Sequence, residues 1–273
     1  MTAQNGTVDD ARDDAAAWSG RCAVVLGRLA LAALLLVAWK IGAGVAGTLY
    51  VADPIAVVQR IVADTLSGEL IRHTLATLRL SAIGFALGCG FGIAVPFALR
   101  RLPRLTAAVE PYIMASVGIP KYALVPLFIL WFGIDDAPKL WLIGLLVFYV
   151  VFIAVFAGIR SVPRGLIDMA RVAGAGEAAI AREVIWNSLL PFFFAALKIA
   201  LPRAVSAAII AEFLVGNEGL GYLIESSRQN FDTTGVFAGI AVATALVLAI
   251  NGVLSLIDRR VNAWRPVDRH MVV

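Results

Sequence analysis

Residues 140–159 read LWLIGLLVFYVVFIAVFAGI, and residues 161–191, just after them, read SVPRGLIDMARVAGAGEAAIAREVIWNSLLP. The first stretch has no charged residue and the roughly 20 apolar residues that a helix needs to cross a hydrocarbon core of about 30 Å. The second stretch is too polar to cross, yet its apolar residues recur at helical spacing. A membrane-spanning helix followed by a polar helical loop is therefore the pattern that decides the fold.

Apolar runs of similar length occur elsewhere in the chain, at about residues 24–43, 75–99, 105–132, 192–215 and 234–257. The sequence therefore predicts an all-α, polytopic membrane protein with six transmembrane helices. Composition agrees, because 60% of the 273 residues are hydrophobic and 15% are charged, whereas soluble domains have about 25% charged residues. The same composition excludes intrinsic disorder and disulfide-rich secreted scaffolds.

Arginines gather beyond the second, fourth and sixth runs, in clusters at residues 100–104, 160–182 and 259–269. By the positive-inside rule these clusters and the N-terminus face the cytoplasm, and the even number of spans puts the C-terminus on the same side. We expect a disordered cytoplasmic tail at residues 1–23, a transmembrane domain at residues 24–260 and a cytoplasmic tail at residues 261–273. The first twenty residues lack the basic region of a signal peptide. No basic face with interleaved aromatic residues occurs outside the apolar runs, so nucleic acid is not an expected partner.

Two local patterns predict packing rather than chemistry. Asp53-Pro54 reads as a helix N-cap followed by proline, and it opens a short amphipathic helix that ends at Ser67-Gly68 and lies on the outer interface. Gly84, Gly88 and Gly92 are four residues apart, so they share one helical face on which another helix can approach closely. A phosphate-binding loop is excluded there, because no strand precedes the glycines and no Lys-Ser/Thr follows.

The third run is interrupted at residues 118–121 (Gly-Ile-Pro-Lys) and again at Pro126. Irregular backbone at membrane depth survives only where protein or a water-filled cavity satisfies its polar groups. Charges at that depth face the bundle interior or a pathway. Candidates for a translocation path are Pro120, Lys121, Pro126, Lys198, Arg203 and Glu212. For each of these residues a structural role stays equally open.

The sequence offers no set of residues for catalysis, a metal or a cofactor. Cys22 and Cys89 are far apart, and His73 and His270 are isolated. We therefore expect no catalytic residue, no metal and no cofactor, and a polytopic membrane enzyme is disfavoured.

Gly174 and Gly176 divide residues 161–191 into two short helices joined by a turn. Leu166, Ile167 and Ala170 lie on one side of the first, and Ile180, Val184 and Ile185 on one side of the second. Spacing alone leaves two alternatives: a surface that docks on another protein, or a loop that packs beneath its own spans.

The stretch resembles a known family. Asp168-Met169-Ala170, followed by Gly174, matches the "EAA…G" loop of inner-membrane permeases of binding-protein-dependent ABC importers, and specifically the nitrate, taurine and alkanesulfonate subgroup. Residues 119–133, 211–213 and 219–224 agree as well, so the resemblance covers about residues 24–260. The chain departs from the family at Asp168, which replaces glutamate, and at Asn187, which replaces a proline, whereas Pro191 is in place. Arg203 is also unusual for the subgroup.

The resemblance implies a type I importer permease, in which two copies of the chain would form a homodimer with the translocation path through the lipid bilayer of the inner (plasma) membrane. Two ABC ATPase subunits would bind the cytoplasmic loops, and an extracytoplasmic binding protein would deliver the solute. The residues that would couple ATP hydrolysis to transport are Asp168, Ala170, Arg171, Ala173, Gly174, Gly176 and Glu177. The chain itself contains no G-x-x-x-x-G-K-[ST] motif. We therefore expect a transport subunit that is not an enzyme.

The intramembrane cations favour a small organic anion of the sulfonate, taurine or nitrate type. The alternatives are an uncharged or cationic solute, such as a pyrimidine vitamin precursor, in the same importer class, and an ion-coupled secondary transporter. The last usually shows inverted repeats, and no repeat relates residues 24–132 to 140–257.

Overall fold

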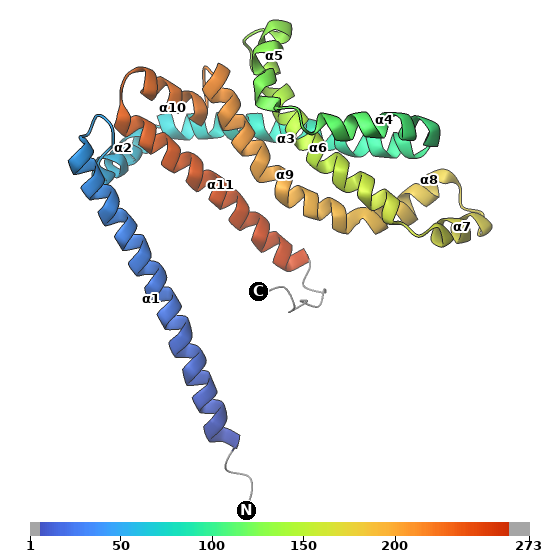
Figure 1. The fold of residues 1–273 in the computed structure, drawn as a ribbon, viewed down its shortest axis with the longest axis horizontal. Coiled ribbons are helices and arrows are strands. Elements are labelled where there is room, and N and C mark those ends of the chain that lie inside the picture. The colour runs from blue at the N-terminus through green and yellow to red at the C-terminus, as the bar shows by residue number, and fades with distance from the viewer. Residues whose placement is uncertain (1–5, 262–273) are drawn as a thin grey trace, which may run out of the picture.

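The structure is a computed structural model that describes residues 6–261, with side chains from residue 24 onward except at positions 258, 259 and 261. It is built from helices throughout this range (Figure 1). The long helices are α1 (Gly6–Ala46), α3 (Glu69–Arg100), α6 (Asp136–Ser161), α9 (Trp186–Val215) and α11 (Thr233–Val261). The shorter elements are α2 (Pro54–Leu66), α4 (Pro103–Ser116), the 3-10 turn η1 (Lys121–Leu124), α5 (Val125–Phe132), α7 (Arg164–Val172), α8 (Glu177–Ala179), the π-helical segment η2 (Ile180–Ile185) and α10 (Leu220–Gln229).

The glycine register shows that α3 and α6 run in the same direction. A Cβ placed on Gly84 would meet Ile143, one on Gly88 would meet Val147, and one on Gly92 would meet Val151. Because both numbers rise together, the chain between the two helices must cross back over the bundle. The α4–α5 pair, which is bent by 93° at its break, makes this return. Together with the five long helices it gives six crossings within residues 6–261, as the sequence predicts.

Helix α6 lies at the centre of the bundle, between α3 and α9. Its residues Val147, Val151 and Val155 are fully buried. They belong to a core cluster that also contains the α9 alanines Ala200, Ala204, Ala207 and Ala208. Small residues on α9 and glycines on α3 let these helices pack closely on α6, which supplies the branched side chains. The shared core makes α3, α6 and α9 one packed unit.

The bend of the third span lies at residues 117–120, where the sequence predicts its first break. Lys121 closes it: its Nζ donates to the carbonyl of Val117 (2.7 Å) and lies 4.5 Å from the centroid of the Tyr149 ring. At the second predicted break the 3-10 turn η1 ends at Leu124 and α5 begins at Val125, so Pro126 lies in the first turn of α5. Proline is tolerated there since its missing N–H would have no helical partner.

Helix α1 differs from expectation at its start. It begins at Gly6, whereas the sequence predicts disorder through residue 23. The segment includes Ala11 and Ala15 to Ala17, and alanine is the strongest helix former. Residues 1–5 and the predicted tail after residue 261 lie outside the described residues. From Val24 onward almost every large apolar side chain of α1 is exposed, and Figure 1 shows the helix diverging from the bundle.

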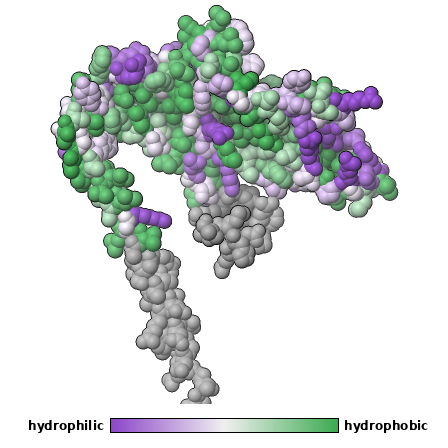
Figure 2. Space-filling model, in the orientation of Figure 1, coloured by the Kyte–Doolittle hydropathy of each residue, from purple (hydrophilic) through white to green (hydrophobic). Residues whose placement is uncertain are grey.

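The bundle has two ends, which we name by the helices that lie there: the α7 end and the α10 end. Figure 2 shows hydrophilic side chains gathered over α7 and α8, and again near α2 and α10, with a largely hydrophobic surface between them. Of the predicted basic clusters, Arg100, Arg160, Arg164, Arg171 and Arg182 belong to the α7 end.

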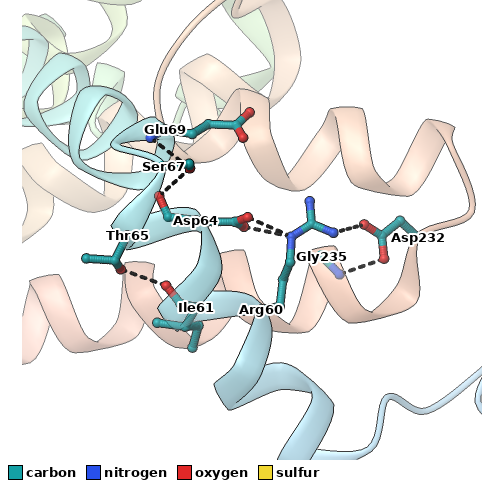
Figure 3. Close-up of polar contacts among 8 residues, drawn as sticks. All are labelled: Arg60, Ile61, Asp64, Thr65, Ser67, Glu69, Asp232 and Gly235. Atoms are coloured by element: carbon teal, nitrogen blue, oxygen red, sulfur yellow. Dashed lines mark hydrogen bonds and ion pairs between the residues drawn. The ribbon is translucent and has the colours of Figure 1, made fainter.

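Ion pairs fasten α2 to the turn before α11 at the α10 end (Figure 3). Arg60 pairs with Asp64 through its Nε and with Asp232 through its Nη1, each at 2.8 Å. Asp232 also accepts from the N–H of Gly235 (2.9 Å). The hydrogen bond that Arg60 donates to the carboxylate of Asp64, with the nearby charge of Asp232, raises the pKa of Arg60 above its ordinary value. The predicted helix at residues 54–66 is confirmed, and Asp53 caps it by accepting from the N–H of Ile55 (2.8 Å).

Candidate functional site

Helix α7 ends in a Schellman motif centred on Gly174. Gly174 has φ +83° and donates from its N–H to the carbonyl of Arg171 (2.9 Å), while the N–H of Ala175 reaches the carbonyl of Ala170 (2.9 Å). This pair of bonds is the usual way to satisfy the last carbonyls of a helix, and it needs a left-handed residue where glycine is favoured. The chain turns sharply after α7 because the residue that follows the end of the helix must adopt a left-handed conformation, and Gly174 at this position does so.

The apolar residues of α7 divide between two surfaces. Ile167 and Ala170 pack on the core cluster beside Ile180 and Ile185. Met169 and Val172, on the other side, are 69% and 91% exposed, and Leu166 is also exposed. One face of α7 therefore packs beneath the chain's own helices, as one of the two alternatives expects. The other face presents an unburied apolar stripe, and docking of a partner there stays a prediction.

The predicted second short helix is wrong as a separate element. The helical segment that begins at Glu177 continues through η2 into α9 without a break. Ile180 and Ile185 of η2 are buried in the core cluster, so packing favours a continuous rod over a free helix. A π-helical segment inside a longer helix is often found at functional sites. Asn187, at the position of the family's proline, donates from Nδ2 to the carbonyl of Glu183 (2.7 Å).

The charged residues of the loop pair within the chain. Arg171 Nη2 donates to Glu177 Oε1 (2.9 Å), and Arg100 Nη2, from the end of α3, donates to Glu177 Oε2 (3.0 Å). Asp168 lies 3.9 Å from Arg171 Nη1 and is exposed. Ala173 and Gly176 are exposed as well. The structure thus brings Asp168, Arg171, Gly174 and Glu177 together on one side of the α7 turn.

Glu212, a candidate for the path, lies instead in a buried hydrogen-bonded cluster at the α10 end. Three successive N–H groups at the start of α10 are each accepted by a different side chain: Gly219 by His73 Nδ1 (3.0 Å), Leu220 by Thr77 Oγ1 (2.9 Å) and Gly221 by Glu212 Oε2 (3.0 Å). These are the N–H groups that an α-helix leaves without internal partners. The carboxylate of Glu212 also sits where the helix dipole favours negative charge.

Glycines enclose this carboxylate. A Cβ on Gly219 would lie 2.1 Å from Glu212 Cδ, and one on Gly221 would lie 2.0 Å from the carbonyl of Ile209. Gly219 also has φ +101°. The glycines are therefore required by close approach. The sequence does not predict a role here for His73, Thr77 or these glycines. No local signal could link His73 to Gly219, since 146 residues separate them.

The other path candidates lie apart from Glu212. Lys121 and Pro120 belong to the bend of the third span. Lys198 and Arg203 lie in the middle third of α9 and are exposed from the bundle. Three charged residues near the α10 end are not among the predicted path candidates: Arg79, Asp136 and Lys139 line a cavity of about 20 Å³ beside Glu212. Lys139 is buried and pairs with Asp136 at 2.7 Å, and the Asp-x-x-Lys spacing was a signal that could have found this pair.

The glycines of α3 are buried against α6. Beside the contact with Val147, a Cβ on Gly88 would lie 2.6 Å from the carbonyl oxygen of Gly144. The apolar groove that continues along this seam, about 480 Å³ in volume, is lined by Leu87, Phe91, Trp141 and Phe148 among others. The seam therefore holds the two parallel helices at a distance that only glycine permits.

Comparison with known proteins gives the chain its family. Residues 84–263 match the family described as "Binding-protein-dependent transport system inner membrane component". SsuC of Bacillus subtilis is 31% identical over 87% of this chain and 87% of its own length, and RibX of Chloroflexus aurantiacus is 34% identical over 85% and 87%. The fold is similar to that of a chain in inward-facing structures of the MetNI methionine ABC transporter, with TM-score 0.61 and 20% identity over 72% of this chain and 98% of that one. The chain therefore belongs to the inner-membrane permeases of binding-protein-dependent ABC importers, and it is a transport subunit rather than an enzyme.

Proposed function

We propose that two copies of this permease form the translocation path for a small organic anion, with α7 as the surface that receives the ATPase subunits. The observation that carries the docking role is the exposed apolar stripe of α7. Leu166, Met169 and Val172 lie in a setting of Arg and Glu, at the end of the bundle that is rich in arginine. A contiguous apolar surface with a charged rim is typical of a protein-binding site. By the positive-inside rule this end, and with it both termini, lies in the cytoplasm.

Transport in this proposal proceeds by alternating access. Closure of the ATPase pair moves the loop of residues 163–188, and the loop moves the packed helices between two arrangements. Asp168, Arg171 and Glu177 carry the charge of this surface, and the small residues Ala173 and Gly176 let an ATPase subunit approach the backbone closely. Ala170 packs on the core cluster and so keeps α7 close to the bundle. Gly174 supplies its turn. The extracytoplasmic binding protein delivers the solute at the α10 end.

The anion follows from charges in the membrane. Lys198 and Arg203 lie exposed on the middle third of α9, and positive charge along a path through the membrane favours an anionic solute. Names of relatives point to more than one solute, since SsuC is named for aliphatic sulfonates and RibX for riboflavin. The two cations favour the sulfonate side of that choice. The carboxylate of Glu212 caps α10, so in this proposal it does not offset the positive charge of the path.

Reconstitution tests the proposal. The permease, its ATPase subunits and its binding protein are placed in liposomes with ATP on the side of the membrane where the ATPase subunits lie. Uptake of labelled ethanesulfonate, an anion, is compared with uptake of riboflavin, which is uncharged. We expect ATP-dependent ethanesulfonate uptake that falls at least about fivefold in Arg203→Gln and Lys198→Gln. Arg28→Gln, which removes a cation from the peripheral helix α1, is the matched control and is expected to transport normally. Uptake without the ATPase subunits would indicate a secondary transporter. A preference for riboflavin would refute the proposal that the solute is an anion.

A further inference from the structure

Glu177 joins three elements through one carboxylate. Its two oxygens accept from different arginines, Arg171 at the end of α7 and Arg100 at the end of α3, while Glu177 itself begins the segment that continues into α9. Within the described residues, the ion pair of Glu177 with Arg100 is a polar link between α3 and the loop of residues 163–188, which we call the coupling loop. Helix α7 packs on η2, and its apolar residues reach the core cluster through Ile180 and Ile185 rather than through α3.

The side chain of Arg100 is largely buried, which strengthens its ion pair with Glu177. Its side chain is only 14% exposed, whereas that of Glu177 is 52% exposed. The Nε of Arg100 is buried without a hydrogen-bond partner, so Glu177 is the carboxylate that compensates a largely desolvated guanidinium. A hydrogen-bonded pair in which one charge is desolvated resists separation more than a pair in water does. Moving Glu177 away would leave that arginine charge without its partner.

The far end of α3 reaches the opposite side of the bundle. There Thr77 accepts from the N–H of Leu220 and donates to Glu212, and His73 accepts from the N–H of Gly219. Between these ends α3 is pressed against α6 by its three buried glycines. Helix α3 is thus joined at one end to the loop by the ion pair of Arg100 with Glu177, and at the other end to α10 by hydrogen bonds. A helix held in this way can transmit a displacement from one face of the membrane to the other.

We infer that Glu177 is a positioning residue that transmits movement of the coupling loop to α3 through its ion pair with Arg100. The inference rests on the proposed function, in which the loop receives the ATPase subunits. It adds a specific mechanical route: Glu177 to Arg100, along α3, to the side chains that hold the start of α10. Arg171, on the same carboxylate, keeps Glu177 attached to α7 while α3 moves.

A double-mutant cycle in the full reconstituted importer tests the route. The variants are Glu177→Gln, Arg100→Gln and the double variant, and the measurement is solute taken up per ATP hydrolysed. We expect each single variant to lower this ratio at least about fivefold, the scale of a measurable coupling between sites, with copurification of the ATPase subunits unchanged. The double variant is expected to be no worse than either single one, because both remove the same pair.

Glu110→Gln is the matched control. It removes the ion pair of Glu110 with Arg160 (3.0 Å for the Nη2 contact), which joins α4 to α6 without involving the loop, and uptake per ATP is expected to stay unchanged. Additive losses in the double variant, or a normal ratio of uptake to ATP hydrolysis in Arg100→Gln, would overturn the inference. Because Arg100→Gln leaves the residues of the loop unchanged, this variant tests the inference even if Glu177→Gln fails to assemble with the ATPase subunits. Absence of ATP-dependent uptake in the unmodified importer would instead refute the proposed function.

Discussion

Thr77 Oγ1 lies 2.8 Å from Glu212 Oε2, and both side chains are buried. The contact joins α3 to α9 across 135 residues of chain. The same hydroxyl accepts from the N–H of Leu220, so three helices meet on one threonine. This explains why a carboxylate is kept inside the membrane-spanning bundle: it serves as a cap for α10.

Thr77→Val tests the cap. Valine has the shape of threonine but leaves the N–H of Leu220 without its acceptor and removes one of the two donors to Glu212 Oε2, the other being the N–H of Gly221. An unsatisfied buried polar group costs about 1–3 kcal/mol. We expect a lower midpoint of thermal unfolding in detergent. Thr74→Val is the control, since the hydroxyl of Thr74 donates to the carbonyl of Leu70 one turn back in its own helix, and it is expected to change the midpoint little. Equal effects of the two variants would argue against the cap.

The α3–α6 seam gives a second prediction. Gly88→Ala places a methyl group 2.6 Å from the backbone carbonyl of Gly144, which cannot rotate away, and overpacking of this kind costs about 1–3 kcal/mol. Gly90→Ala, on the open side of the same helix where nothing lies within 4 Å, is expected to be neutral or stabilising by about 0.5–1 kcal/mol. Thermal unfolding of the two variants measures the difference. A stable Gly88→Ala would mean that the helices separate readily at this seam.

The apolar runs predict the long helices because a bilayer imposes length and hydropathy directly on the sequence. The break before Lys121 can also be predicted from the sequence, since Pro120 lacks a backbone N–H and disfavours helical backbone at Ile119. Contacts between distant segments are not readable in this way. The pairing of Arg100 with Glu177 spans 77 residues, and the capping of Gly219 by His73 spans 146.

The function of an intramembrane charge is the part of the site that sequence leaves most open. Lys121 and Glu212 both appear as charges in apolar runs, yet each satisfies backbone groups freed by an irregular segment. Lys121 serves carbonyls at the bend, and Glu212 serves an N–H at the start of α10. Which polar group a buried charge compensates depends on the fold, so local sequence does not separate such residues from those of a path.

The N-cap of α2 predicts a specific pH dependence. The hydrogen bond from Lys40, followed by that from the N–H of Ile55, lowers the pKa of Asp53 below its ordinary value of 3.8. The folded chain therefore holds the carboxylate more readily than the unfolded chain does. The resulting stabilisation is present above that ordinary value and is lost as the pH falls through the lowered pKa.

Hydrogen exchange of the first turn of α2, corrected for the intrinsic rate at each pH, measures this effect. We expect protection to be constant from neutral pH down to about pH 4 and to fall below it. Asp53→Asn keeps an N-cap acceptor but carries no charge, so its protection is expected to lack that acidic step. An acidic step of equal size in the asparagine variant would assign it to another group.

Gly174 gives the prediction that bears most directly on transport. Its φ of +83° costs other residues about 1–2 kcal/mol, and β-branched valine tolerates it least. A Cβ there would meet nothing within 4 Å, so the effect of substitution lies in the backbone turn and not in a clash. Gly174→Val therefore shifts the end of α7 while leaving the core unchanged. We expect ATP hydrolysis to continue and uptake to fall several-fold in the reconstituted importer. Gly165→Ala, in the same helix with open space and ordinary φ, is the control that should transport normally. Full uptake in Gly174→Val would show that the turn is not needed for coupling, because the variant alters the turn and nothing else that the loop contacts.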